Sequence, residues 1–234
     1  MSLCLAPWLV RYVCPNTSSI NCKGVLKFIN MKILKTNKRQ ICITCHYPQN
    51  TCLCDWINPI TSPLNIIILQ HPKETRHAKN TVKLLALGLK KIMILQGEKP
   101  DDWTELSQNM AKRPHDYSLF YPHEQSKSVE SIISTESKES IFPINHNVIF
   151  IDASWRKALK IWHLNPWLQL CDSWHFSNPP DNQYHVRHTT QKNSLSTLES
   201  VVYALEYIHN INCAPLHTLL SKMQQKCFLE NYKQ

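Results

Sequence analysis

The stretch LNIIILQHP at residues 64–72 joins an apolar run of strand length to the polar sequence Gln70-His71-Pro72. A pattern of apolar residues at helical spacing follows it and ends near Gly88. Pro72 is suited to the first turn of that helix, because proline tolerates a position where the backbone N–H would have no partner. The order of strand, polar segment and helix is typical of an α/β fold.

The same order recurs at residues 147–155, which read NVIFIDASW. Asp152 comes at the carboxyl end of the apolar strand, just before a helix predicted to begin near Ser154. Open α/β sheets bind ligands at such strand ends, so Asp152 is a candidate site residue. Further strands are predicted at 91–95 and 118–121, and further helices at 195–208 and 215–229. This alternation predicts an α/β sheet with parallel pairs and helices on both faces.

Four cysteines lie within thirteen residues, at Cys42, Cys45, Cys52 and Cys54. A C-x-x-C turn followed by C-x-C can bring four thiolates to one point, which is the ligand set of a structural zinc ion. A disulfide within C-x-C would be strained, and no convincing signal peptide indicates secretion. The pattern therefore favours a zinc knuckle over disulfides, with an iron–sulfur cluster as a further alternative.

The composition limits the class of protein. The chain has 234 residues, 43% of them hydrophobic, which is enough for one main core with the metal knuckle attached. It contains only three glycines. Dinucleotide-binding and phosphate-cradling loops need clustered glycines, because the backbone must approach the phosphate closely, so these functions are disfavoured. No apolar run reaches membrane-spanning length, and no membrane partner is expected.

The net charge of +9 is concentrated near the N-terminus, where residues 1–54 carry seven Lys or Arg and no acid. Lys35, Lys38 and Arg39 lead into the knuckle and suit the phosphate backbone of RNA, while a solvated tail is the structural alternative. Residues 1–30 also resemble an organellar presequence, and the sequence leaves open whether they persist in the mature protein. We otherwise expect a cytoplasmic protein.

Three parts are predicted along the chain. A basic, flexible extension covers residues 1–38, the zinc knuckle covers 39–58, and an α/β domain covers 59–234. The oligomeric state is not indicated.

Several separated segments match one family in chain order. They are the cysteine knuckle, LQHPKE at 69–74 with Lys79-Asn80-Thr81, Tyr121-Pro122, IDASWRK at 151–157 and LSTLE at 195–199. On these segments the chain resembles the DTW-domain family over residues 39–210. The resemblance implies a SPOUT-like fold with a knotted C-terminal part. The family's Asp-x-Thr-Trp motif is altered here, with Ala153 at the variable position and Ser154 in place of threonine. Serine keeps the hydroxyl and caps helices equally well.

The resemblance implies a tRNA-uridine aminocarboxypropyltransferase. Such an enzyme transfers the 3-amino-3-carboxypropyl group of S-adenosylmethionine to N3 of a uridine in tRNA and releases methylthioadenosine. Neither the tRNA nor the uridine position is indicated. Two alternatives stay open. One is an S-adenosylmethionine-dependent RNA methyltransferase, because only the carbon held in line with the nucleophile reacts. The other is a noncatalytic zinc-dependent RNA-binding module.

Asp152 is the candidate general base, since a uridine imide must lose or share its proton before N3 can attack. A charge at a helix N-terminus is its structural alternative. The residues expected to bind the cofactor are Gln70, His71, Pro72, Ser154, Trp155, Leu195, Ser196, Thr197 and Glu199. The residues expected to bind RNA are Arg156, Lys157, Arg187, Lys35, Lys38 and Arg39.

Some of these residues also have structural interpretations. Ser196 and Glu199 have the spacing of a capping box, so Glu199 is ranked as cofactor or structural support. Trp155 recurs with Leu159 and Trp162 on one helical face, which favours packing in the core over contact with the cofactor.

Overall fold

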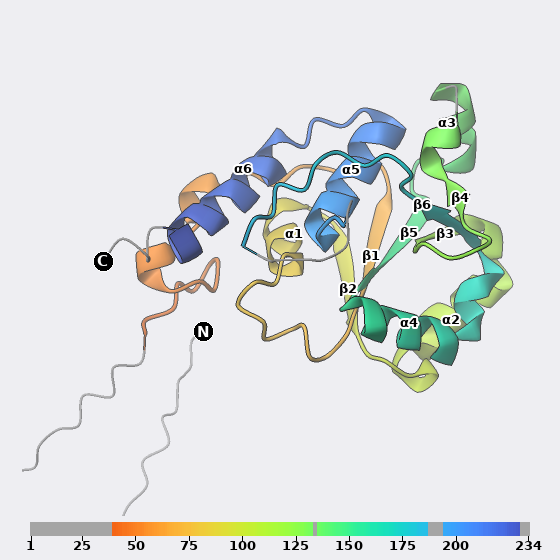
Figure 1. The fold of residues 1–234 in the computed structure, drawn as a ribbon, viewed down its shortest axis with the longest axis horizontal. Coiled ribbons are helices and arrows are strands. Elements are labelled where there is room, and N and C mark those ends of the chain that lie inside the picture. The colour runs from red at the N-terminus through yellow and green to blue at the C-terminus, as the bar shows by residue number, and fades with distance from the viewer. Residues whose placement is uncertain (1–38, 133–134, 187–193, 230–234) are drawn as a thin grey trace, which may run out of the picture. The chain divides into compact units, whose positions relative to one another are not determined.

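The computed structural model describes residues 39–132, 135–186 and 194–229. Within these ranges six strands form one sheet, in the order β2-β1-β5-β3-β6-β4, and all of its neighbouring strands are parallel (Figure 1). The strands are β1 Asn65–Gln70, β2 Ile92–Gln96, β3 Tyr117–Phe120, β4 Lys127–Ser128, β5 Asn147–Asp152 and β6 Asp172–His175.

The helices alternate with these strands along most of the chain. They are α1 Val82–Gly88, α2 Thr104–Lys112, α3 Thr135–Ile141, α4 Trp155–Leu164, α5 Thr197–His209 and α6 Ala214–Gln224. Short 3-10 turns occur at Gln49–Thr51, Cys54–Trp56, Pro100–Trp103, Pro114–Asp116, Val129–Ser131 and Pro166–Leu170, and a π-helical turn at Gln225–Leu229 follows α6. Over the described ranges, no helix has the length and apolar character that crossing a membrane requires.

Side chains that alternate along β1 enter two separate cores. Ile66 and Ile68 pack on one face with α1, α5 and α6, whereas Ile67 and Leu69 pack on the other with α2 and α4. Each such side chain stabilises the fold by about 1.5–3 kcal/mol when fully buried. Helices therefore cover both faces of the sheet (Figure 1), which confirms the predicted α/β architecture with parallel pairs.

The helix predicted to begin at Pro72 begins only at Val82. Turns occupy residues 72–81 instead, and in the first of them the N–H of Glu74 donates to the carbonyl of His71 over 2.9 Å. The residues before Val82 are almost all polar, so a helix here would have no apolar face to bury against the sheet. The β1–α1 connection is consequently a long loop on the surface.

Two predicted features lie outside the described residues. One is the basic extension at 1–38. The other is the knot, because the connection between β6 and α5 includes residues 187–193. The predicted knot and the SPOUT-like class therefore stay predictions.

Candidate active site and metal centre

A cavity of about 440 Å³ opens at the carboxyl ends of β3, β5 and β6. The motif residues 152–155 form one part of its wall, and residues 194–197, which lead into α5, form another. Ser154, at the N-cap of α4, is part of this lining. A concave site of this size suits a small-molecule ligand, and it lies at the edge of the sheet where ligands of α/β proteins bind.

Asp152 is held from two sides at the wall of this cavity. One carboxylate oxygen, Oδ2, accepts a 2.8 Å hydrogen bond from Nε2 of Gln70 at the end of β1. The other, Oδ1, accepts a 2.6 Å hydrogen bond from the hydroxyl of Thr197 at the start of α5. Asp152 itself is only 8% exposed. Donors on both oxygens fix the orientation of the carboxylate, and charge-assisted bonds of this kind are among the stronger ones in proteins.

The three residues predicted from the end of β1 have different surroundings. Gln70 is buried and donates to Asp152, so it lies behind the carboxylate. His71 is also buried, and its Nε2 lies 3.2 Å from Oε1 of Glu98. Pro72 is exposed on the following loop. The described lining of the cavity includes none of the three, so their contact with a cofactor stays a prediction.

Trp155 opens α4 and lines the cavity with 45% of its surface exposed. Leu159, one turn further along, is 49% exposed. The prediction that these two residues pack in the core is therefore wrong, and only Trp162 of the trio is buried. The helix meets the sheet through Ala158 and Ile161 instead, which turns Trp155 and Leu159 outward. The exposed indole is left free to contact a ligand.

The predicted capping box at the start of α5 is confirmed. The backbone N–H of Glu199 donates to Oγ of Ser196 over 3.3 Å, and the carboxylate of Glu199 accepts from the N–H of Ser196 over 2.8 Å. The same carboxylate accepts a 2.6 Å bond from the N–H of Gln183. Leu195, Ser196 and Thr197 line the cavity, whereas its described lining does not include Glu199. The observed contacts of Glu199 are those of structural support.

The predicted RNA-binding residues have different environments. Arg156 is exposed on α4, and Arg39 is exposed where the described chain begins. Lys157 forms an ion pair within the protein, with its Nζ 2.8 Å from a carboxylate oxygen of Glu74. Lys35, Lys38 and Arg187 lie outside the described residues.

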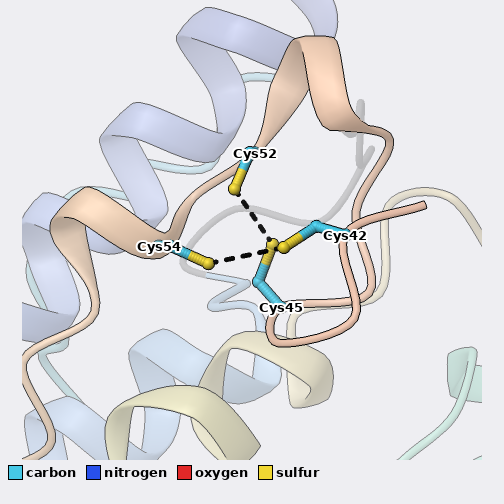
Figure 2. Close-up of side chains that lie close together, drawn as sticks. All are labelled: Cys42, Cys45, Cys52 and Cys54. Atoms are coloured by element: carbon cyan, nitrogen blue, oxygen red, sulfur yellow. Dashed lines mark hydrogen bonds between the residues drawn. The ribbon is translucent and has the colours of Figure 1, made fainter. Parts of the chain in front are cut away.

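The four cysteines of the knuckle converge as the sequence predicts, and Figure 2 shows their sulfur atoms facing one another. All four Sγ atoms lie within 4.8 Å of one another. The Cys42–Cys54 pair is 3.6 Å apart and the Cys45–Cys52 pair 3.7 Å apart. A tetrahedral zinc ion with Zn–S bonds of about 2.3 Å requires S···S distances of about 3.8 Å, whereas a disulfide requires about 2.0 Å. The spacing fits four thiolates around one metal ion.

The electrostatics of the knuckle also fit a cation. Backbone N–H groups of Cys45 and Thr44 lower the pKa of the Cys42 thiol to about 6. The neighbouring sulfurs of Cys52 and Cys42 raise the pKa of the Cys54 thiol to about 12. Deprotonation of all four thiols is therefore unfavourable without a cation, because their negative charges lie close together. A bound metal ion would make it favourable by coordinating the thiolates.

The knuckle is packed into the main core. Cys45 and Leu53 are fully buried. The ammonium of Lys83 on α1 donates to the carbonyl of His46 over 2.6 Å, and α6 packs against the turn Cys54–Trp56. A change in the conformation of the knuckle would thus disturb the packing of both helices.

The family model of the DTW domain matches residues 39–228. The chain belongs to the DTW domain family. Asp152, Ser154 and Trp155 lie within the matched range, and all three line the cavity.

The curated relatives that this DTW protein matches are named tRNA-uridine aminocarboxypropyltransferases. The tRNA-uridine aminocarboxypropyltransferase 2 of Mus musculus is 27% identical over 194 residues, which cover 81% of this chain and 63% of the relative. The protein of the same name from Drosophila melanogaster is 26% identical, over 78% of this chain and 74% of the relative. The tRNA-uridine aminocarboxypropyltransferase A of Arabidopsis thaliana is 46% identical over 55 residues, which cover 23% of this chain and 21% of the relative. The match thus spans less than two thirds of the mouse relative's length. No solved structure matches the chain.

Sequence reasoning missed part of the cavity wall. Phe176, Asn182 and Tyr184 line the cavity from the irregular segment after β6. No periodicity marks such a segment, and only the fold brings it beside the motif residues. The hydroxyl of Tyr184 donates to the carbonyl of Lys79 over 2.8 Å, which anchors this wall to the β1–α1 loop.

Proposed function

We propose that this protein modifies tRNA by transferring the 3-amino-3-carboxypropyl group of S-adenosylmethionine to N3 of a uridine, with release of methylthioadenosine. The observation that carries the proposal is the buried motif acid Asp152 at the wall of a cavity of about 440 Å³, in a DTW-family chain. Relatives in the same family are named tRNA-uridine aminocarboxypropyltransferases.

The lining of the cavity fits a cofactor with an aromatic base and polar groups. Tyr121 and Trp155 offer ring faces, and Ser154 and Ser196 offer hydroxyls. The buried Nε1 of Trp174, another residue of the lining, has no hydrogen-bond partner among the described residues, and an acceptor atom of a ligand is one way to satisfy it. S-adenosylmethionine bound here would supply an electrophilic carbon next to its sulfonium.

Asp152 is assigned the role of general base toward the uridine N3–H. An ionised carboxylate can act as a positioned general base, and Gln70 and Thr197 donate to the two oxygens of Asp152. The two bonds hold the carboxylate in one orientation, which is what positioned proton transfer requires.

The remaining roles are proposed from charge and ligand chemistry. Arg156 and Arg39 are exposed cations that would contact tRNA phosphates, together with the basic extension at 1–38. The four cysteines would hold a structural zinc ion, with iron as the alternative metal. A cytoplasmic location remains part of the proposal.

Mass spectrometry tests the reaction directly. Purified protein is incubated with unmodified tRNA and S-adenosylmethionine, and the nucleosides and the spent cofactor are analysed. We expect aminocarboxypropyluridine together with methylthioadenosine, and both at a rate lower by about a hundredfold or more with Asp152→Asn. Methyluridine with S-adenosylhomocysteine would replace the proposal by methyl transfer. Tight tRNA binding without any product would favour the noncatalytic module.

A further inference from the structure

The β1–α1 loop, residues 72–79, exposes a cluster of basic side chains. The exposed bases are Lys73, Arg76 and His77. The loop contains one acid, Glu74, which is only 8% exposed and forms the 2.8 Å ion pair with Lys157. The outer surface of the loop therefore carries positive charge that no exposed carboxylate of the loop opposes.

Hydrogen bonds hold this loop in a defined shape. The N–H of Lys73 donates to Nδ1 of His71 over 3.0 Å, and the hydroxyl of Thr75 donates to the carbonyl of Pro72 over 2.8 Å. At the far end, the ammonium of Lys79 donates to the carbonyl of Val186. The exposed cations consequently project from a pre-organised backbone, which reduces the entropy lost when they bind a ligand.

The loop is also tied to the candidate active site. Its first residues follow Gln70, which donates to Asp152, and its ion pair with Lys157 joins it to the first turn of α4. Arg156 is exposed on the same turn, next to Trp155 of the cavity lining, and adds a positive charge there. In Figure 1 the loop and the start of α4 lie on the same edge of the sheet, the one formed by the carboxyl ends of its strands.

Acidic side chains limit this surface on the side of β2. Asp101 and Asp102 are exposed just beyond that strand. Glu98 is nearer to the loop, but Lys160 lies 3.1 Å from its carboxylate, and this contact is the main cause of its lowered pKa. A polyanion is thus attracted to the loop and to α4 more than to the end of β2, where the two aspartates and Lys99 are exposed together.

We infer that the loop 72–79 and Arg156 form one surface for the phosphate backbone of the tRNA, and that this surface guides the substrate strand to the cavity. The inference rests on the proposed function, because it names where the same enzyme holds its substrate. Lys and Arg side chains that contact phosphates release condensed counterions, so each contact contributes both affinity and salt dependence. The guanidinium groups of Arg76 and Arg156 can also bind a phosphate through two hydrogen bonds.

Paired variants test the surface by tRNA binding at several salt concentrations. Lys73→Ala with Arg76→Ala removes two charges from the loop. Lys90→Ala with Lys91→Ala is the matched control, because these exposed residues precede β2 at the opposite, amino edge of the sheet. For the loop variant we expect about tenfold weaker binding at physiological salt and a log–log salt slope smaller by about 2. The control should keep the affinity and the slope of the parent.

The two proposals fail in different ways. Melting temperatures and S-adenosylmethionine binding equal to the parent show that the loop variant is folded. The phosphate surface is overturned if the folded loop variant keeps the salt slope of the parent. It is also overturned if the control variant loses as much tRNA affinity and salt slope as the loop variant, even if product is formed. If the loop variant and the control have the expected salt slopes but the parent protein forms no modified uridine, the proposed reaction is overturned and the phosphate surface is retained. Failure of the parent protein to bind tRNA overturns both.

Discussion

Replacing Thr197 with valine removes one of the two described hydrogen bonds that hold the Asp152 carboxylate and nearly preserves the shape of the side chain. The 2.6 Å distance from Oγ1 of Thr197 to Oδ1 of Asp152 is in the range of a strong O–H···O⁻ bond. Bonds to charged groups contribute about 1.5–3 kcal/mol. The 2.8 Å bond from Gln70 remains, and water can enter from the cavity, so we expect the free energy of unfolding to fall by about 1.5 kcal/mol.

The same substitution should slow the proposed transfer, because the carboxylate then loses one of the hydrogen bonds that fix its orientation. If about 1.4 kcal/mol of the lost interaction acts in the transition state, kcat falls about tenfold. The KM for tRNA should not change, since Thr197 lies in the cavity wall and not on the loop 72–79.

Urea unfolding followed by tryptophan fluorescence measures the stability, and mass spectrometry of the modified tRNA measures the rate. Thr197→Ser is the matched control, because serine keeps the hydroxyl that donates to Asp152. We expect the serine variant to retain most of the rate that the valine variant loses. Equal rates for the two variants would refute the conclusion that the hydroxyl orients the carboxylate.

Four further substitutions test other parts of the structure. Asp152→Asn should bind S-adenosylmethionine and tRNA nearly as well as the parent but lose about a hundredfold or more in turnover. Parental turnover by this variant would remove Asp152 from the mechanism. Glu199→Gln should lower the urea midpoint before it lowers turnover, because the Glu199 carboxylate accepts two backbone N–H groups. Elemental analysis should find about one zinc ion per chain. Cys42→Ser should lower the stability of the fold more than the rate of the reaction. A metal-free protein that is folded and active would contradict the assignment of the knuckle. Gly88→Ala would place a Cβ atom 2.3 Å from Cδ2 of the buried Leu216. We expect this overpacking to lower the free energy of unfolding by about 1–3 kcal/mol, as measured by chemical denaturation. An unchanged midpoint would show that Leu216 moves aside.

The strands that carry the site could be predicted because they are marked locally. β1 and β5 are apolar runs that end in polar residues, and both were placed within a residue of their observed bounds. Asp152 was recognised for the same reason. Its partner Gln70 was assigned to a cofactor instead, because the parallel register that sets Gln70 beside Asp152 is a property of the sheet and not of either segment.

The features that were missed depend on tertiary packing. The side of α4 that meets the sheet is decided by the path of the helix, so the apolar spacing of Trp155 and Leu159 did not reveal that both are exposed. The loop 72–79 was assigned to a helix because an apolar pattern was extended into polar residues. Its ion pair joins Glu74 and Lys157, which are 83 residues apart, and no local pattern could have indicated it.

The packing of the knuckle against α6 sets an order of events during translation. The four thiols lie within thirteen residues of sequence, but the helix that packs against the turn after Cys54 ends only at Gln224. At about 5–20 residues per second, the ribosome needs about 10 to 30 seconds to cover that interval. During this time the nascent thiols have no finished core to shield them. Early capture of a metal ion would protect them from oxidation and would give the growing domain its first folded element.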